Sequence, residues 1–188
     1  SKYCKIKNWD FIIIGDKKSP IKYKIKYGKF FSLDEQKKLN LNYSKICPEN
    51  SYSRKNIGYL VALKRNNKIL IESDDDNFPK YNFFKKRKAK HAVKEILNNG
   101  WINIYEYFLK TGQNIWPRGL PLQKIKSNKI RVSKTTKSIN FFLQQGLADN
   151  NPDVDAIYRL MNDKIDIKFS RNKKISIGKS ISPTNSQN

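Results

Sequence analysis

Residues 68–77 read KILIESDDDN, a short apolar run that ends in three consecutive aspartates. A continuous apolar run of this length, rich in β-branched side chains, is typical of a buried strand in a parallel sheet. The aspartates would then follow the carboxyl end of that strand, where open α/β sheets bind their ligands. Because alternate side chains of an extended backbone share a face, Asp74 and Asp76 would point together and Asp75 away.

Two carboxylates in this arrangement favour a divalent cation. Oxygen ligands at positions i and i+2 can hold Mg²⁺ or Mn²⁺, and the cation would hold the phosphates of a substrate. The chain has 16 acidic residues beside 39 basic ones, yet four acids fall within residues 72–76. Crowding like charges costs free energy unless a cation offsets it. We therefore predict a metal site at Asp74 and Asp76, with a solvated acidic turn as the alternative.

The composition limits the classes of protein to consider. A chain of 188 residues suits one domain with a core of its own. No apolar run approaches the ~20 residues of a membrane-spanning helix. Two cysteines provide neither a disulfide framework nor a metal-binding spacing, which predicts a reducing, cytoplasmic compartment. The single histidine leaves almost no room for a zinc cluster or a Ser-His-Asp triad.

The net charge of +23 suggests nucleic acid as one class of partner. The positive residues are mainly lysines spread over most of the chain, and they do not form an arginine-rich face. Since base and phosphate recognition favours the bidentate arginine fork, we expect no specific nucleic-acid binding. The charge would still attract an anionic substrate or the surface of a membrane.

A second apolar run, residues 9–14, also reads as a strand, and it stops at Gly15 and Asp16. At the carboxyl end of that strand, Asp16 could accept a hydrogen bond from a nucleoside base or ribose. An aspartate in an ordinary turn is the alternative.

A helix is predicted from about residue 54 to residue 65, with an apolar stripe along one side. Its first turn carries Arg54, Lys55 and Asn56. Cations at the amino end of a helix oppose its dipole, so their placement favours an anion bound to the free N–H groups there. We therefore expect Arg54 and Asn56, together with Asp16, to hold the nucleoside and phosphates of a ligand.

Four other local patterns predict secondary structure. Ser32 and Glu35 match a capping box at the start of a short helix. Residues 91–99 read as a helix closed by Gly100, residues 101–105 alternate like a strand, and a further helix is predicted over about residues 153–161.

Five blocks of the sequence, read in order, resemble the STELLO-like glycosyltransferase family, which is similar to the reversibly glycosylated polypeptides. The blocks are residues 55–60 (KNIGYL), 72–77 (ESDDDN), 116–122 (WPRGLPL), 146–149 (GLAD) and 152–159 (PDVDAIYR). The resemblance implies a GT-A-like, three-layer α/β fold with a mixed, mainly parallel sheet. It also implies sugar transfer from a nucleoside-diphosphate donor, here a UDP-sugar, to a glycan or surface-polymer acceptor, with the metal on Asp74 and Asp76.

The same resemblance gives an expectation for the domain. On this resemblance, the first strand of the fold, expected before Trp9, would be missing or cut away, and the carboxyl end would stop where family members continue. We therefore expect an incomplete glycosyltransferase-like domain over residues 1–179, and a flexible tail or truncated continuation over residues 180–188.

Arg118 stands between Pro117 and Gly119, which exclude regular secondary structure. An arginine fixed on such a loop suits a diphosphate or an anionic acceptor. The alternative is that Trp116 belongs to the core and that Arg118 is half of a structural ion pair.

Asp153 and Asp155 are the remaining candidates for a general base, which would deprotonate an acceptor hydroxyl. The alternative is that both simply favour the amino end of the helix that follows.

The predicted function is metal-dependent transfer of a nucleotide-linked sugar, with Arg118, Asp153 and Asp155 facing the sugar or acceptor. Three alternatives stay open. A metal-dependent nucleotidyltransferase would also use paired aspartates, a nucleic-acid-binding module would need no metal, and a catalytically silent scaffold would keep only the fold.

Overall fold

The computed structural model describes residues 1–79, 81–85, 87–109, 114–125, 129–162 and 166–183. The chain divides into two compact units, one over Ser1–Lys85 and the other over the described residues from 87 onward. Each unit is described by itself. The single domain expected over residues 1–179 stays a prediction. In the predicted tail, Ser180 and Ile181 form a strand, whereas residues 184–188 lie outside the described part of the chain.

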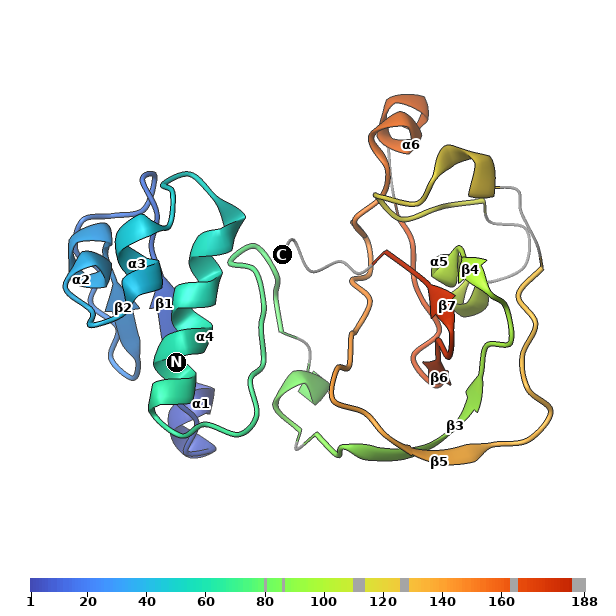
Figure 1. Ribbon diagram of the computed structural model, residues 1–188, viewed down its shortest axis with the longest axis horizontal. Coiled ribbons are helices and arrows are strands. Elements are labelled where there is room, and N and C mark those ends of the chain that lie inside the picture. The colour runs from blue at the N-terminus through green and yellow to red at the C-terminus, as the bar shows by residue number, and fades with distance from the viewer. Residues whose placement is uncertain (80, 86, 110–113, 126–128, 163–165, 184–188) are drawn as a thin grey trace. The chain divides into compact units, whose positions relative to one another are not determined.

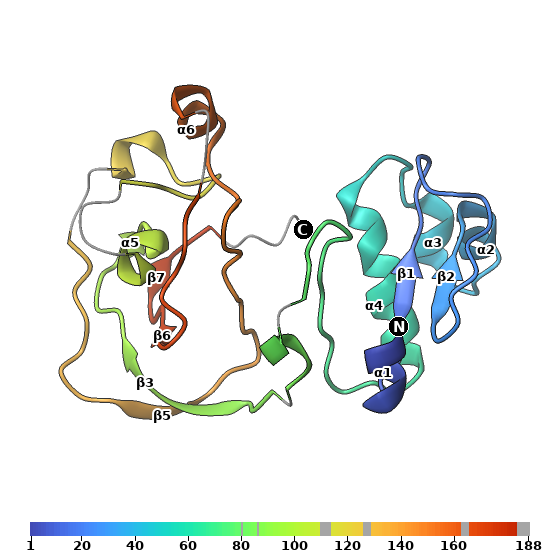
Figure 2. The same cartoon turned by 180° about the vertical axis from the view of Figure 1, so that it is seen from behind.

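Two short parallel strands and the helix that covers them form the centre of the first unit (Figure 1). Strand β1 (Ile12–Ile14) pairs with β2 (Lys29–Phe31), and helix α4 (Lys55–Lys64) lies against β1, which is also seen from behind in Figure 2. The remaining elements are α1 (Lys2–Ile6), α2 (Leu33–Lys37), α3 (Asn42–Ile46), and two 3₁₀ turns, η1 (Tyr52–Arg54) and η2 (Tyr81–Phe84).

Helix α4 and the capping box of α2 confirm two of the local predictions. The Ser32 side chain accepts a hydrogen bond from the Glu35 amide, and the Glu35 carboxylate accepts one from the Ser32 amide. On α4, Ile57 and Val61 are buried in the core of the unit. A Cβ on Gly58 would lie 3.0 Å from Cγ1 of Ile14, so this glycine permits the close approach of α4 to β1.

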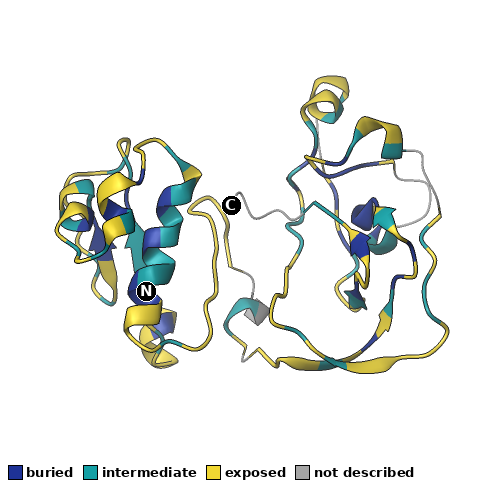
Figure 3. Cartoon of the chain, viewed as in Figure 1, coloured by how far each residue is buried: buried dark blue, intermediate teal, exposed yellow. Residues whose placement is uncertain are grey.

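The apolar run that follows α4 is not a strand, which corrects the first prediction. Residues 69–74 have no regular secondary structure, and Ile69 is 64% exposed. Figure 3 shows the segment after α4 in the colour of exposed residues. Polar contacts hold the segment instead: the Asn67 amide donates to the Ala62 carbonyl, and Glu72 accepts from side chains of α4. An apolar pattern shows only that a segment can pair, whereas pairing also requires a free neighbouring edge.

The second unit contains a three-stranded and a two-stranded sheet. In the order β5-β3-β6, β3 (Lys90–Glu95) is antiparallel to β5 (Lys137–Asn140) and parallel to β6 (Ile175–Ser176). Strand β4 (Gly100–Trp101) is parallel to β7 (Ser180–Ile181). The helices are α5 (Ile104–Phe108), α6 (Ala156–Met161) and a 3₁₀ turn, η3 (Leu122–Lys124). The buried core is made of Ile96, Ile102, Ile104, Tyr105, Leu109, Ile115, Val154, Ile167 and Phe169.

Two predictions for this unit are wrong. Residues 90–95 form β3, where a helix was predicted over 91–99. Of the predicted strand 101–105, only Trp101 lies in a strand, β4, before α5 begins at Ile104. The buried Val93 and Ile96 lie three positions apart, a spacing that fits a helix as well as a strand that ends in a bridge. Pairing with β5, which is distant in sequence, decides between the two.

The mixed α/β class with mixed sheets is confirmed. Within the described residues the strands form three small sheets, and three of the four strand pairings are parallel. Cys4 and Cys47 are buried free thiols. No helix in the described part of the chain has the length and apolar character that a bilayer crossing requires.

Candidate functional site

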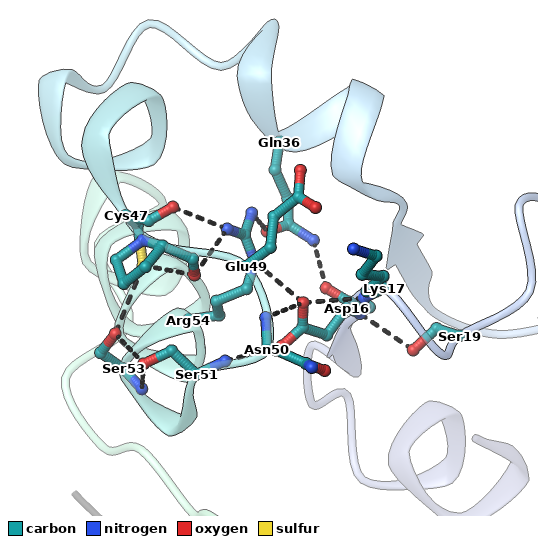
Figure 4. A network of polar contacts seen from close by, with 12 residues as sticks. Asp16, Lys17, Ser19, Gln36, Cys47, Glu49, Asn50, Ser51, Ser53 and Arg54 are labelled. Atoms are coloured by element: carbon teal, nitrogen blue, oxygen red, sulfur yellow. Dashed lines mark hydrogen bonds and ion pairs between the residues drawn. The ribbon is translucent and has the colours of Figure 1, made fainter.

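Asp16 lies directly after β1 and anchors a loop from a distant part of the chain (Figure 4). Its carboxylate accepts hydrogen bonds from the amides of Lys17 (2.7 Å), Asn50 (2.9 Å) and Ser51 (3.1 Å). Asn50 has a φ of +56°, a left-handed conformation that asparagine tolerates, and this turn presents its N–H to Asp16. Asp16 therefore supplies the anion at the amino end of the η1–α4 helix, where the sequence suggested a bound ligand.

Arg54 is only 3% exposed, and its guanidinium is used inside the first unit. Nη1 donates to the carbonyls of Cys47 and Pro48, and Nη2 donates to Oε1 of Gln36 at 2.5 Å. Nε lies 3.9 Å from Oδ1 of Asp16. Figure 4 shows the guanidinium enclosed by these partners. These contacts give Arg54 a structural role, and its predicted part in holding phosphates stays a prediction.

Gln36 is a member of this network that the sequence did not reveal. Its side chain is completely buried, and Nε2 donates to the carbonyls of Gly15 (2.7 Å) and Phe31 (2.8 Å). These carbonyls follow β1 and end β2, so one amide joins the carboxyl ends of both strands to Arg54. A glutamine three residues after Leu33 on a short helix was the available signal, since that spacing places both on one face.

Replacing Asp16 by Asn is expected to lower the free energy of unfolding at pH 7 by about 2 kcal/mol, because an amide nitrogen would face N–H donors and Arg54. Burial alone would raise the pKa of Asp16. The hydrogen bonds from the amides of Asn50, Lys17 and Ser51 and the charge of Arg54 have the larger combined effect, so the pKa of Asp16 lies below its ordinary value. A carboxyl whose pKa is lowered by folding stabilises the fold above its unfolded pKa, and that contribution disappears as the pH falls through the folded pKa.

Urea unfolding at several pH values tests this prediction. The difference between wild type and Asp16→Asn should be constant near neutral pH and shrink below about pH 4. Asp34→Asn, an exposed position on α2, is the control and should show little difference at any pH. A pH-independent loss in Asp16→Asn would contradict the electrostatic explanation.

The acidic run 72–76 lies against the first turns of α4. Glu72 accepts hydrogen bonds from the Lys55 ammonium and the Tyr59 hydroxyl. Burial, and then the hydrogen bond to Glu72, raise the pKa of Tyr59. Burial also raises the pKa of Asp74; Lys55 opposes this effect, while Asp76, Glu72 and Asp75 add to it. The mutual repulsion that the sequence suggested is therefore present, and Lys55 offsets part of it.

The run itself forms a turn, which corrects the extended geometry predicted for it. Residues 75 and 76 are in the turn, and the Asn77 amide donates to the Asp74 carbonyl at 3.3 Å. Asp74 and Asp76 therefore do not share one face of a strand. Among the described residues, no group of three or more His, Cys, Asp or Glu side chains is arranged to hold a metal ion.

The predicted nucleotide-site residues all belong to the first unit and surround the amino-terminal part of α4. Asp16 and Arg54 contact each other, and Nδ2 of Asn56 donates to the Tyr43 hydroxyl at 3.3 Å. Asp74 is near enough to Lys55 for the lysine charge to act against the rise in the pKa of Asp74. Asp76 acts on Asp74 through its charge. Helix α4 thus connects the acidic run to the Asp16 network.

In the second unit, Arg118 and Asp153 form an ion pair. Nη2 of Arg118 lies 2.8 Å from Oδ2 of Asp153, with the two side chains 49% and 19% exposed. Gly119 has a φ of +84°, which ends the Trp-Pro-Arg-Gly loop in a conformation that suits glycine. This ion pair is the structural alternative considered for Arg118, although the guanidinium remains half exposed.

Asp155 is the N-cap of α6, and its Oδ1 accepts a hydrogen bond from the Ile157 amide at 2.9 Å. Both candidates for the general base therefore also have structural contacts: Asp153 pairs with Arg118, and Asp155 caps α6. Trp116 is 6% exposed and its ring meets the Tyr158 ring edge-on at 5.0 Å, as expected for a core residue.

The second unit also contains polar groups that the sequence did not single out. Arg159 donates to Oδ1 of Asn151 and to the Pro152 carbonyl, while the buried Tyr105 hydroxyl donates to the Asp153 carbonyl at 3.0 Å. Burial, and then the charge of Asp153, raise the pKa of Tyr105, whereas Arg118 and Arg159 lower it. One carboxylate and two guanidinium groups therefore act on the same hydroxyl.

The protein is therefore of the mixed α/β class, and in each unit an arginine pairs with an aspartate at a loop or a helix end: Arg54 with Asp16, and Arg118 with Asp153. No family model matches the chain. It is similar to the probable glycosyltransferase STELLO2 of Arabidopsis thaliana, with 31% identity over 169 residues that cover 82% of this chain and 22% of the relative. For the probable glycosyltransferase STELLO1 of the same plant, the identity is 27% over 209 residues, covering 98% of this chain and 26% of the relative.

These similarities confirm the resemblance predicted from the sequence and support a STELLO-like glycosyltransferase family for this chain. Both relatives are named probable glycosyltransferases. The chain spans about a quarter of the length of the curated relatives it matches.

Proposed function

We propose that this protein is a metal-dependent glycosyltransferase that uses a nucleoside-diphosphate sugar and has a GT-A-like fold. The observation that carries the proposal is the similarity to two probable glycosyltransferases over most of the chain. A UDP-sugar donor, a glycan or surface-polymer acceptor, and a cytoplasmic location with contact at a membrane surface belong to the same proposal.

The acidic run over residues 72–76 supports the proposed metal dependence. Mg²⁺ is bound in many phosphate-transfer sites by one or two carboxylates together with substrate phosphates and water. Asp74 and Asp76 would provide those carboxylates, and the charges of Glu72 and Asp75 add to the negative charge around Asp74. Bound at these residues, Mg²⁺ or Mn²⁺ would supply positive charge to the leaving diphosphate.

The protein's own residues would position the donor. Asp16, after β1, has its Oδ1 engaged by two amides and its Oδ2 by one, so Oδ2 keeps acceptor capacity for a base or ribose group. Arg118 would meet the transferred sugar, the acceptor or the β-phosphate. An arginine at such a position stabilises negative charge that develops on oxygen.

Mn²⁺ together with UDP is expected to raise the melting temperature by about 5–10 °C at a hundredfold excess over the dissociation constant, because the ligand binds only the folded state. The double variant Asp74→Asn/Asp76→Asn should lose this increase, since an amide is a poor metal ligand. Its unfolding without ligand should be unchanged, because both side chains are exposed.

The control is Asp34→Asn/Asp166→Asn, which removes the same charge from exposed positions elsewhere in the chain. It should keep the full shift. If the Asp74/Asp76 variant retained the metal-dependent increase, the metal assignment would be wrong. If no nucleoside diphosphate shifted the wild type with any divalent cation, the catalytically silent scaffold would be the better description.

A further inference from the structure

Asp153 and Arg118 belong to two loops that the backbone joins firmly. Pro117 and Val154 form an antiparallel bridge, the Arg118 amide donates to the Asp153 carbonyl at 3.1 Å, and the Asp155 amide donates to the Trp116 carbonyl at 3.4 Å. The buried Tyr105 hydroxyl bonds the same Asp153 carbonyl. The main chain of both residues is therefore fixed, and only the side chains are left to rearrange.

The side-chain pair, in contrast, is easily opened. Arg118 is 49% exposed, and an ion pair with this much solvent access changes an equilibrium constant by about fivefold at most. An arginine fork can bind a phosphoryl or carboxylate group through two parallel hydrogen bonds, and such bidentate pairs are the strong ones. An oxyanion that arrives from solvent can thus replace Asp153 as the partner of Arg118.

The local charge favours such an exchange. Arg159 bonds Asn151 and Pro152, the two residues that precede Asp153. Both arginines and Asp153 influence the pKa of the Tyr105 hydroxyl, which itself donates to the Asp153 carbonyl. Asp153 is paired with Arg118 and Asp155 caps α6, so Arg159 adds a positive charge next to the pair.

We propose that Asp153 is a positioning residue, and not the general base: it holds Arg118 in place and releases it to an oxyanion of the bound ligand. A general base has to be held in place against the acceptor hydroxyl, and opening the pair with Arg118 removes the partner that fixes the Asp153 carboxylate. The oxyanion is a phosphoryl group of the donor or a carboxylate of an acidic acceptor sugar. This inference rests on the proposed function only for the identity of that ligand.

Binding of inorganic pyrophosphate tests the exchange without requiring turnover. Asp153→Asn removes the competing carboxylate, so pyrophosphate should bind about two- to fivefold more tightly than to wild type. Asp155→Asn, which removes an equal charge two residues away and keeps a side chain that caps helices well, should change the affinity much less. Affinities are measured by calorimetry at 0.15 M salt, where exposed charges are screened.

A double-mutant cycle assigns the effect to Arg118. In an Arg118→Ala background, Asp153→Asn should no longer tighten pyrophosphate binding, because the residue released by the substitution is gone. The same set of variants is titrated with glucuronate; the anion whose affinity depends on Arg118 identifies the source of the oxyanion. The melting temperature of each variant confirms that it is folded.

Two results would overturn the proposal. One is equal tightening by Asp153→Asn and Asp155→Asn, which would indicate a change in net charge alone. The other is tightening that persists without Arg118. Failure of the proposed function can be distinguished from failure of this inference. If the protein has no glycosyltransferase activity but still shows the Arg118-dependent effect on pyrophosphate binding, the exchange at Arg118 is supported and only the proposed glycosyl transfer is wrong.

Discussion

Replacing Arg54 by Met is expected to lower the free energy of unfolding of the first unit by about 3–5 kcal/mol, the usual result of removing one partner from a buried ion pair. Met keeps the approximate length of the aliphatic part of arginine and removes the guanidinium group with its charge. The substitution would leave Oε1 of Gln36 and the carbonyls of Cys47 and Pro48 without their shared donor, and it would remove the positive charge beside Asp16. Each buried polar group that loses its partner adds to the cost.

Amide hydrogen exchange can measure this loss within the first unit. Amides of β1 and α4 should exchange much faster in Arg54→Met, while those of β3 in the second unit report whether the effect is local. The control is Arg65→Met, whose side chain is 43% exposed and lies 3.8 Å from Asp10, a pair worth about 0–1 kcal/mol. Equal losses in the two variants would contradict the structural role of Arg54. A stable Arg54→Met protein that fails to bind nucleotide would instead support the phosphate contact predicted from the sequence.

The second large effect is expected on catalysis. Arg118→Lys should lower turnover by about a hundredfold while changing the affinity for the donor much less. Lysine keeps the charge but replaces the planar fork by a point charge, so a geometry that depends on two parallel hydrogen bonds is lost. An interaction made mainly in the transition state affects turnover more than it affects binding.

The chain offers a matched control for this variant. Arg171 lies in the same unit, and its Nη2 pairs with Oδ2 of Asp149 at 3.0 Å, much as Arg118 pairs with Asp153. Arg171→Lys should therefore keep turnover near the wild-type value. Turnover and donor affinity are measured separately for both variants with a nucleoside-diphosphate sugar. Full turnover in Arg118→Lys and in Arg118→Ala would make Arg118 a structural residue.

The parts of the structure that could be predicted are those determined by neighbouring residues. The capping box of Ser32 and Glu35 and the helix over Lys55–Lys64 depend on side chains within one or two turns, and both are present. The strand over Lys90–Glu95 was read as a helix because its apolar spacing fits both periods. The choice depends on pairing with residues more than forty positions later, which a local pattern cannot contain.

The contacts of the candidate site residues could not be predicted for the same reason, since they join distant parts of the chain. The acidic run and the Arg118 loop were found from residue types alone, but the partners of these residues were not. Asp16 reaches amides 34 and 35 positions away, and Arg118 reaches a carboxylate 35 positions later. A polar side chain gives no sequence signal of which distant group will satisfy it. Such contacts can be recognised only once the chain has folded.

The exposed apolar segment after α4 gives the neighbouring acidic run a further physical consequence. Residues 69–71 are β-prone, partly solvated and unpaired with any described strand, the features of a segment that associates with copies of itself. Lys68 precedes them, and Glu72 and three aspartates follow. Charges at the borders of such a segment act as gatekeepers, because stacking identical strands would bring like charges together. Repulsion among the aspartates thus opposes self-assembly through this segment, whether or not a ligand is bound.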